Sequence, residues 1–553
     1  MFLFVSLFFC FQVFSQVRDQ YNPNKQVLID LSLRLSSEYK INHDQAVEKA
    51  LKSGFPLIME PEEGLFMELQ YFKENRPYFF ITHNVPAAQT ISTNKLHPGG
   101  VSGFGLTGFG QTIGLWDGGK VRLTHQEFQG RAEQVDEVSG NLTHSTHVAA
   151  TLIGEGFHPQ SKGMAYQAQL KAWEWNNDVA EMAEAAANGI ILSNHSYGFV
   201  TGWRYNTGDG VWYWFGDTQV SEDEDFFFGF YSSTAKEWDE IAYLAPYYLI
   251  VKSAGNDRGY GPPYQPIQHY VYSDTSWVVS DQIRQRDGGT LGFDCISHSG
   301  VSKNVLTVGA VHSINNGYSQ PSDVVMTSFS SWGPTDDGRI KPDVVAKGVG
   351  TLSASAPSNT SYTSLDGTSM ATPSVTGSIA LINQHFQSFY PDSMLRASTL
   401  KALVIHSADP ATEHKGPDYR FGWGLMNTYN AARIISEDVQ SGGSFNIREC
   451  TLTQDSIIEF QVEAIGNTPL VVTIAWNDPP ATPLPDQNNP QQLMLINDLD
   501  LRVSKDDITY SPFVLNPASP MDSPATGDNF RDNVEKVFIE NPQPGLYTIR
   551  ISH

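Results

Sequence analysis

Short apolar runs that stop at a polar or glycine-rich turn recur through the middle of the chain. Residues 111–117 form one such run, which ends in Asp117, and residues 249–256 form another, which ends in Asn256. A short apolar run bounded by turn residues is typical of a strand buried in a parallel sheet. The carboxyl ends of such strands meet at one edge of the sheet. The pattern therefore predicts an α/β domain with Asp117 and Asn256 at that edge.

A helical pattern follows the sequence Gly-Thr-Ser at residues 367–369. Apolar and small residues recur at helical spacing over residues 370–385, which predicts a helix that packs against the sheet. Gly367 allows backbone angles that other residues disfavour, and Thr368 and Ser369 favour a helix start. Ser369 would then lie at the positive end of the helix, where free N–H groups stabilise negative charge. Taken alone, Ser369 has a second interpretation, as an ordinary helix cap.

The last part of the chain has a different pattern. Residues 441–444 are glycine and serine, a composition typical of a linker. Short alternating strands follow it, separated by turns rich in Pro, Asn, Asp and Gly. The strands are predicted at 457–462, 470–476, 499–503, 537–539 and 546–551. They predict an antiparallel β-sandwich over residues 444–553.

Composition and charge restrict the class of protein. The chain has 553 residues, 46 of them glycine and 31 proline, with only 17% charged residues, which suits a loop-rich globular protein. This length predicts about three or four domains. The formal net charge of −25 argues against nucleic acid or an anionic membrane as a partner, because both repel an acidic surface. We expect protein or peptide partners and a monomer.

The amino terminus predicts secretion. Residues 1–14 are almost purely apolar and uncharged, and the run is too short to span a bilayer, so residues 1–15 are expected to be a signal peptide. No later run is long and apolar enough for a membrane helix, which predicts a secreted or cell-surface protein. Cys295 and Cys450 would remain after signal removal. Two unpaired thiols are favoured over an inter-domain disulfide, and the sequence leaves both open.

Four polar residues together indicate nucleophilic catalysis. A serine nucleophile needs a base to take its proton and an acid to orient that base. His144 opens an apolar, helix-like run, Asp117 ends a strand, and Asn256 can aim its amide at a developing oxyanion. Each of them alone has an ordinary interpretation as a turn or cap residue. His144 and His147 are spaced like zinc ligands, but no acidic or cysteine cluster nearby completes a metal site.

These blocks resemble the subtilisin-like serine proteases (subtilases), whose catalytic residues follow the order Asp, His, Ser. The similarity spans residues 110–432 and includes Ser-Asn-His-Ser-Tyr-Gly at 193–198 and Phe-Gly-Trp-Gly-Leu-Met-Asn at 421–427. Ser145 departs from the family, which usually has glycine after the catalytic histidine. The interval from Asn256 to Ser369 is longer than a compact member needs and indicates inserted loops, one of them at residues 257–295.

The resemblance implies a role for each residue. Ser369 is the nucleophile, His144 the general base and then acid, and Asp117 the group that holds the imidazole in its working tautomer. Asn256 and the Ser369 N–H would bind the oxyanion, and His147 is structural. The implied substrate-binding residues are Ser196, Tyr197, Gly198, Ser253, Ala254 and Gly255. The implied catalytic domain covers residues 101–438 and has a mainly parallel sheet flanked by helices.

Subtilases are commonly made with an N-terminal propeptide, and residues 16–100 occupy that position. They contain a predicted short helix at 44–53 and strand-like runs at 65–72 and 78–82. We expect a propeptide-like segment that is cleaved between Asn84 and Gly105. The alternative is a permanent accessory domain.

Two blocks of the C-terminal part resemble the jelly-roll domain of a large-subtilase branch related to the kexin-type P domain. They are Ala-Trp-Asn-Asp-Pro-Pro at 475–480 and Ile-Asn-Asp-Leu-Asp-Leu at 496–501. Asp478, Asp498 and Asp500 could supply oxygen ligands for a structural calcium ion, or could simply be solvated turn residues. No organic cofactor is expected.

Substrate preference is left open by the sequence. Residues 198–248 are rich in aromatic and acidic side chains, which could form an acidic rim that favours basic peptides or an insertion with its own small core. A binding protein that lost proteolysis is a rival, as is an esterase, although Ser369 lacks the Gly-x-Ser-x-Gly context of one. A working triad needs a neutral histidine, so we expect a neutral to alkaline optimum.

Overall fold

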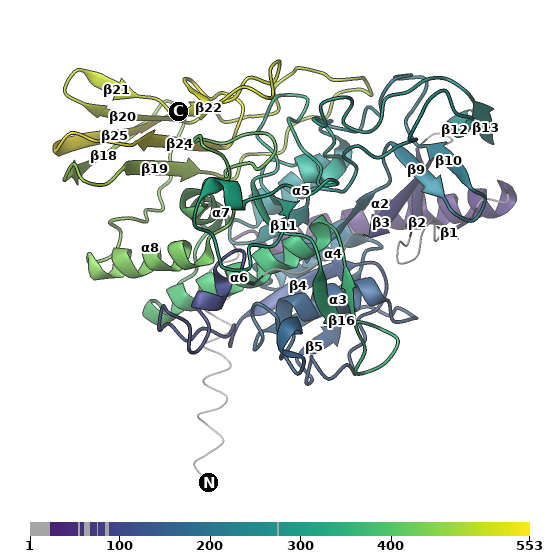
Figure 1. Ribbon diagram of the computed structural model, residues 1–553, viewed down its shortest axis with the longest axis horizontal. Helices are drawn as coiled ribbons and strands as arrows, with labels where there is room; N and C mark the ends of the chain where they lie inside the picture. Colours follow the sequence, from purple (N-terminus) through teal and green to yellow (C-terminus); the bar gives the residue numbers. More distant parts are fainter. Residues whose placement is uncertain (1–22, 54–55, 60–66, 74–75, 83–87, 274–275) are drawn as a thin grey trace, which may run out of the picture.

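A computed structural model describes residues 23–53, 56–59, 67–73, 76–82, 88–273 and 276–553. The predicted signal peptide and residues 84–87 of the predicted cleavage region lie outside the described residues. Figure 1 shows a helix-flanked sheet in the centre, the yellow C-terminal strands at the upper left, and the purple N-terminal elements at the right.

A seven-stranded sheet forms the centre of the molecule, and every neighbouring pair in it is parallel. Its spatial order is β15-β14-β11-β7-β4-β6-β5. The strands are β4 (Thr112–Asp117), β5 (Ala132–Gln134), β6 (Gln169–Glu174), β7 (Leu192–His195), β11 (Leu249–Ser253), β14 (Leu306–Val311) and β15 (Val344–Lys347). This sheet confirms the predicted α/β class. Strand β4 ends at Asp117 as predicted, whereas β11 ends at Ser253, three residues before Asn256.

Helices cover both faces of this sheet. One face packs against α3 (Thr143–Ile153), α6 (Thr368–Phe389), α7 (Ala397–Ser407) and α8 (Thr428–Gln440), and the other against α4 (Asp178–Ala187) and α5 (Ser233–Leu244). The side chains of adjacent residues point to opposite faces of the sheet, because side chains alternate along a strand. Val251 thus joins the core beneath α6, whereas Ile250 joins the core beneath α4 and α5.

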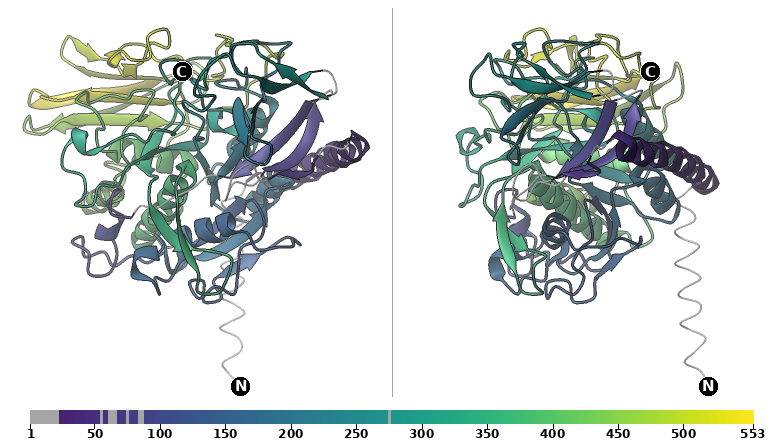
Figure 2. Two further views of the ribbon diagram at one scale, coloured as in Figure 1. Left: turned by 45° about the vertical axis from the view of Figure 1, so that its right-hand side comes forward. Right: turned by 90° about the vertical axis from the view of Figure 1, so that its right-hand side faces the viewer.

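The N-terminal part packs against the α4 side. Its helix α2 (Lys25–Ser53) begins much earlier than the predicted helix at 44–53, because Leu28, Leu31 and Leu35 bury one face of it in the same core as α4. The short strands are β1 (Ile58–Met59), β2 (Met67–Lys73) and β3 (Arg76–Thr82). They continue into β8 (Tyr197–Phe199), so the N-terminal part and the central body share one four-stranded sheet. Figure 2 shows α2 and these strands from two further sides.

The C-terminal part is antiparallel throughout, as predicted. One sheet has the order β18-β25-β20-β21, and β19 and β24 pair separately. The strands are β18 (Ile457–Ala464), β19 (Leu470–Ala475), β20 (Asp500–Lys505), β21 (Ile508–Tyr510), β22 (Phe513–Val514), β23 (Ala525–Thr526), β24 (Val534–Ile539) and β25 (Gly545–Ser552). Leu501, Val503, Val537 and Tyr547 are among the residues that form a core between the two layers.

The aromatic segment 198–248 and the segment 257–295 together build a sheet of order β13-β12-β10-β9. Its strands are β9 (Trp203–Asn206), β10 (Val211–Trp214), β12 (His269–Ser273) and β13 (Ser276–Ser280). Trp203 and Trp214 are fully buried in a small cluster with Val271. The structure therefore favours the self-packed interpretation for these aromatic side chains. A further hairpin, β16 (Thr351–Ala354) with β17 (Tyr362–Leu365), lies beside α3.

Within the described ranges, no helix has both the length and the apolar character needed to cross a membrane. Cys295 and Cys450 are both unpaired thiols, the first buried and the second exposed, which agrees with the favoured of the two alternatives.

Candidate active site

Asp117 and His144 form a buried pair at the carboxyl end of β4. Asp117 is the last residue of β4, and His144 lies in the first turn of α3. The His144 ring is hydrogen-bonded through Nδ1 to Asp117 Oδ1, which also accepts the Gly118 N–H at 2.8 Å. Burial raises the pKa of the Asp117 carboxyl more than the pairing with His144 lowers it. With Nδ1 engaged, Nε2 is the nitrogen of His144 that can take a proton.

Ser369 lies in the first turn of α6, two residues after the N-cap Gly367, whose φ of +151° favours glycine. Its hydroxyl donates to the Ser196 carbonyl at 2.6 Å, and the Ser196 hydroxyl donates to the Ser369 carbonyl at 2.8 Å. Helices α3 and α6 pack against each other, so the structure brings the His144 and Ser369 helices together at the edge of the sheet. Ser369 itself is fully buried.

Asn256 follows β11 and points its acceptor at the start of α6. Its Oδ1 accepts from the Thr368 N–H at 2.9 Å and from the Thr368 hydroxyl at 3.0 Å. Both hydrogen bonds that the described residues make with this side chain end on Oδ1. The acceptor end of the amide is therefore fixed at Thr368, the residue before Ser369.

The predicted substrate-binding residues lie on two neighbouring segments. Tyr197 and Gly198 belong to β8, and their strand pairs antiparallel with β3 in the register Ile81 to Gly198 and Thr82 to Tyr197. Ser253 ends β11, and the Ala254 N–H donates to Val308 O at 3.0 Å. Ser196 adjoins β8 and touches Ser369 directly. One edge of β8 is thus covered by the N-terminal part of the chain.

A buried lysine that sequence reasoning missed lies behind these segments. Lys252 Nζ donates to the carbonyl of Tyr197, and to the carbonyl and hydroxyl of Ser253 at 3.1 Å each. Burial lowers its pKa to about 7. A lysine inside the apolar run 249–256 is the only sequence signal of this arrangement.

Tyr197 is fixed from the other side by a polar network. Its hydroxyl donates to Asp178 Oδ2 at 2.6 Å and lies 3.2 Å from His195 Nδ1. All three side chains are buried, and burial raises the pKa of Asp178 to about 6. The network holds the β8 backbone rigid beside Ser369.

His147 and Ser145 make structural contacts. His147 Nε2 lies 3.1 Å from the Thr351 carbonyl, and burial lowers its pKa to about 3. The Ser145 hydroxyl donates to the Leu142 carbonyl at 3.2 Å, within its own helix. Among the described residues, no group of three or more His, Cys, Asp or Glu side chains is arranged to hold a metal ion.

The expected calcium ligands are largely engaged by basic side chains. Asp478 is ion-paired with Lys303, and both are fully buried. Asp500 lies 2.8 Å from the Arg502 guanidinium. Asp498 is close enough to Asp500 for that neighbour to raise its pKa, after the larger effect of burial. A calcium ion at these three residues stays a prediction.

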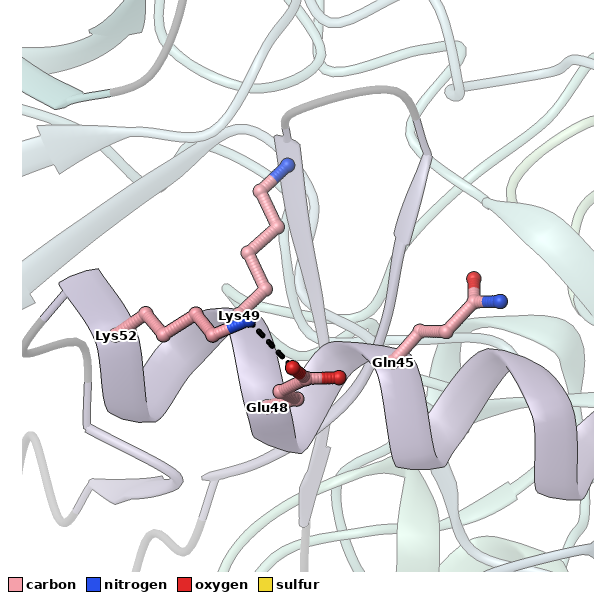
Figure 3. A pocket seen from close by; sticks show the side chains of 4 residues that line it. All are labelled: Gln45, Glu48, Lys49 and Lys52. Atoms are coloured by element: carbon pink, nitrogen blue, oxygen red, sulfur yellow. Dashed lines mark hydrogen bonds and ion pairs between the residues drawn. The ribbon is translucent and has the colours of Figure 1, made fainter.

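A shallow hollow lies on α2, away from these residues (Figure 3). Gln45, Glu48, Lys49 and Lys52 line it, and Glu48 and Lys52 form an ion pair one helical turn apart. Exposed ion pairs of this kind stabilise a helix only slightly and hold their side chains loosely. The hollow therefore has no polar group fixed in position for a ligand.

Comparison with known proteins places these features in a family. The family described as Subtilase family, Peptidase_S8, matches residues 118–424, more than half of the chain. This range contains His144, Asn256 and Ser369.

Two curated relatives are serine proteases by name. The chain is 23% identical over 474 residues to the serine protease/ABC transporter B family protein tagD of Dictyostelium discoideum, covering 67% of this chain and 25% of that protein. It is 40% identical over 148 residues to the serine protease AprX of Bacillus subtilis (strain 168), covering 25% of this chain and 31% of that protein. The chain thus spans between a quarter and a third of the length of these relatives.

A solved structure, that of the self-cleaved protease domain of PatA, is 20% identical to this chain, with a TM-score of 0.40. The alignment covers 61% of this chain and 99% of that domain.

Proposed function

Since the chain belongs to the subtilase family, we propose that it is a serine endopeptidase with Ser369 as nucleophile, His144 as general base and Asp117 as the orienting acid. The observation that carries this is the buried His144–Asp117 pair beside the α6 terminus that bears Ser369. A base held in one tautomer near a hydroxyl at a helix N-terminus is the arrangement that acyl transfer needs.

The proposed reaction begins when Ser369 gives up its hydrogen bond to the Ser196 carbonyl. Its hydroxyl proton passes to His144 Nε2 as Oγ bonds to the substrate carbonyl carbon. The carbonyl oxygen takes negative charge, which Asn256 Nδ2 and the Ser369 N–H stabilise. His144 then gives the proton to the leaving amine, and water repeats the sequence to release the acyl group. His144 must be neutral at the start, so the rate falls at acidic pH.

The proposed substrate is an extended peptide that pairs with β8. Strand β3 already adds to this edge in antiparallel register, which is how a peptide recognises a free strand edge. The carbonyl that Ser369 contacts belongs to Ser196, directly before β8. A peptide on this edge would therefore run past the nucleophile.

We propose on the same grounds that residues 16–100 include an inhibitory propeptide. While β3 occupies β8, a substrate cannot. Ile91 and Leu96 are fully buried in the core of the central body, and the Thr428 N–H donates to Ile91 O at 3.0 Å. Removal of Ile91 would open that core, so we expect cleavage at its amino side, in the part of the predicted range nearest Asn84. Sequencing of active secreted protein should find a first residue between 84 and 91; a start near Val17 would overturn the proposal.

The decisive test is labelling with a serine-reactive fluorophosphonate. The secreted protein should be labelled, and Ser369→Ala and His144→Ala should both abolish labelling. Ser145→Ala is the matched control, because its hydroxyl bonds within α3 and has no proposed role. Correctly processed protein that does not label would favour a binding protein that has lost proteolysis.

A further inference from the structure

An arginine outside the proposed triad is joined to the turn that carries Asn256. Arg204 lies in β9, and its guanidinium is 2.6 Å from Asp257 Oδ1. Asp257 directly follows Asn256 in the chain. Among the described residues, no other basic side chain has a nitrogen within 4.0 Å of the Asp257 carboxylate. The contact therefore links the inserted sheet, formed by β9, β10, β12 and β13, to the residue beside the proposed oxyanion donor.

The Asp257 carboxylate folds back over the same turn. A side-chain carbon at Gly255 would lie 2.9 Å from Asp257 Oδ2, and Gly255 has a φ of +104°, which favours glycine. The carboxylate thus lies against Gly255 through Oδ2 and against Arg204 through Oδ1. Asn256 is the residue between Gly255 and Asp257, so a contact that fixes this carboxylate also restrains Asn256.

Ser331 attaches the turn to the central body. Its N–H donates to the Gly255 carbonyl at 3.0 Å, and its hydroxyl accepts the Asp257 N–H at 3.1 Å. These two hydrogen bonds fix the backbone on either side of Asn256. The ion pair with Arg204 adds a third point of attachment, which comes from the inserted sheet.

The Arg204 guanidinium is itself fixed within the inserted sheet. It donates to the Trp203 carbonyl and lies 3.9 Å from Asp287 Oδ2. Asp287 in turn accepts the Trp203 N–H at 3.1 Å, and Trp203 is fully buried. Arg204, Asp257 and Asp287 are each less than one-tenth exposed. A buried guanidinium with charge-assisted contacts on two sides has little freedom to move, so it can hold Asp257 in one position.

We propose that Arg204 is a positioning residue for the oxyanion site, because it fixes the turn of Asn256 through Asp257. This inference rests on the proposed role of Asn256 as an oxyanion donor. Such a donor acts only when it is held where negative charge develops, and a displacement of about 1 Å can lower the rate about a hundredfold. The inserted sheet then contributes to the reaction, in addition to packing its own aromatic side chains.

A double-mutant cycle on kcat tests this inference. Arg204→Met and Asn256→Ala are made singly and together in the full chain, and steady-state kinetics on a peptide substrate give kcat and KM. We expect Arg204→Met to lower kcat roughly tenfold to a hundredfold, with KM little changed. In the Asn256→Ala background the same change should lower kcat less than about threefold, because the donor that Arg204 positions is already absent. Arg204→Lys keeps the positive charge and should retain more of kcat than Arg204→Met.

A second variant keeps the test valid if Arg204→Met fails to fold. Asp257→Ala removes the same contact, yet Arg204 keeps Asp287 as a counter-charge at 3.9 Å. It should also lower kcat, and again only when Asn256 is present. Arg284→Met is the matched control, because Arg284 is a buried arginine of the segment 257–295 whose ion pair is with Glu222, at 2.7 Å. This control should leave kcat close to that of the parent.

The possible outcomes separate this inference from the proposed function. An equal fall in kcat in both backgrounds would overturn the inference alone, since Arg204 would then act on something other than Asn256. An unchanged kcat in Arg204→Met and in Asp257→Ala would overturn it as well. An unchanged kcat in Asn256→Ala would overturn the proposed role of Asn256, and this inference with it. A parent that neither cleaves peptides nor reacts with the fluorophosphonate would overturn the proposed function as a whole.

Discussion

The proposed oxyanion contact of Asn256 depends on how its amide is oriented. Thr368 offers two donors to Asn256, and both end on Oδ1. Nδ2 of the same amide therefore points away from Thr368 before any substrate binds. A donor fixed in advance costs no reorganisation when charge develops, which is why such contacts contribute strongly to catalysis.

We predict that Asn256→Ala lowers kcat by roughly a hundredfold to a thousandfold, with KM little changed, because the contact forms mainly in the transition state. Asn256→Asp keeps the acceptor for Thr368 but lacks the N–H donor, so it should lose rate as well. Steady-state kinetics on a peptide substrate measure both. A variant with a raised KM and an unchanged kcat would show that Asn256 contributes to ground-state binding instead.

At the scale of elements, helix α7 and strand β19 meet through a half-buried histidine. His406 in α7 has Nδ1 3.0 Å from the Thr473 hydroxyl in β19. Burial, and then the charge of Lys536, lowers its pKa to about 3. The folded protein therefore keeps His406 neutral under conditions in which the unfolded chain would protonate it.

This gives a pH dependence with a defined sign. Between the unfolded value of about 6.5 and the folded value of about 3, the unfolded state holds the extra proton, so stability falls as pH falls. The loss is about 2 kcal/mol between pH 7.5 and pH 5.

We predict that His406→Gln, in the Ser369→Ala background, loses about 2 kcal/mol less than its parent between pH 7.5 and pH 5. Urea unfolding at the two pH values measures the difference. His312→Gln, at an exposed histidine, should follow the parent. Equal losses for His406→Gln and the parent would mean that the folded protein can protonate His406.

On the scale of the whole molecule, the sandwich is fastened to the central body by a buried ion pair. Lys303 Nζ contacts Asp478 and also donates to Met494 O at 2.8 Å. Asn304 and Asp478 exchange two further hydrogen bonds of 2.8 Å each. These polar groups are buried, so each side of the interface supplies the hydrogen-bond partners that the other side needs.

We predict that Asp478→Ala destabilises the chain by about 3–5 kcal/mol, because it leaves a buried ammonium without its counter-charge. Asp500→Ala removes a partly exposed pair and should cost at most about 1 kcal/mol. The double variant Lys303→Met with Asp478→Leu should cost less than the sum of the single changes. Urea unfolding measures all of them, and a loss for Asp478→Ala no larger than for Asp500→Ala would contradict the prediction.

The sequence by itself determined those features of the protein that depend on only a few neighbouring residues. An apolar run with a polar end specifies a strand and the residue displayed at its edge, as at Asp117, and a glycine before small residues specifies the start of α6. The alternating strands beyond residue 444 are readable for the same reason. Side-chain period and turn chemistry act over a few neighbouring residues, so no distant partner is needed to recognise them.

Only the tertiary structure decided which distant groups meet. The pairing of β3 with β8 and the placement of Lys252 behind Tyr197 each join segments that lie far apart in the chain. Helix α2 likewise reaches back to Lys25 because α4 buries its leucines, and its own pattern was too weak to show this. Burial and charge neutralisation depend on the environment that the folded chain supplies, and the order of residues alone does not contain it.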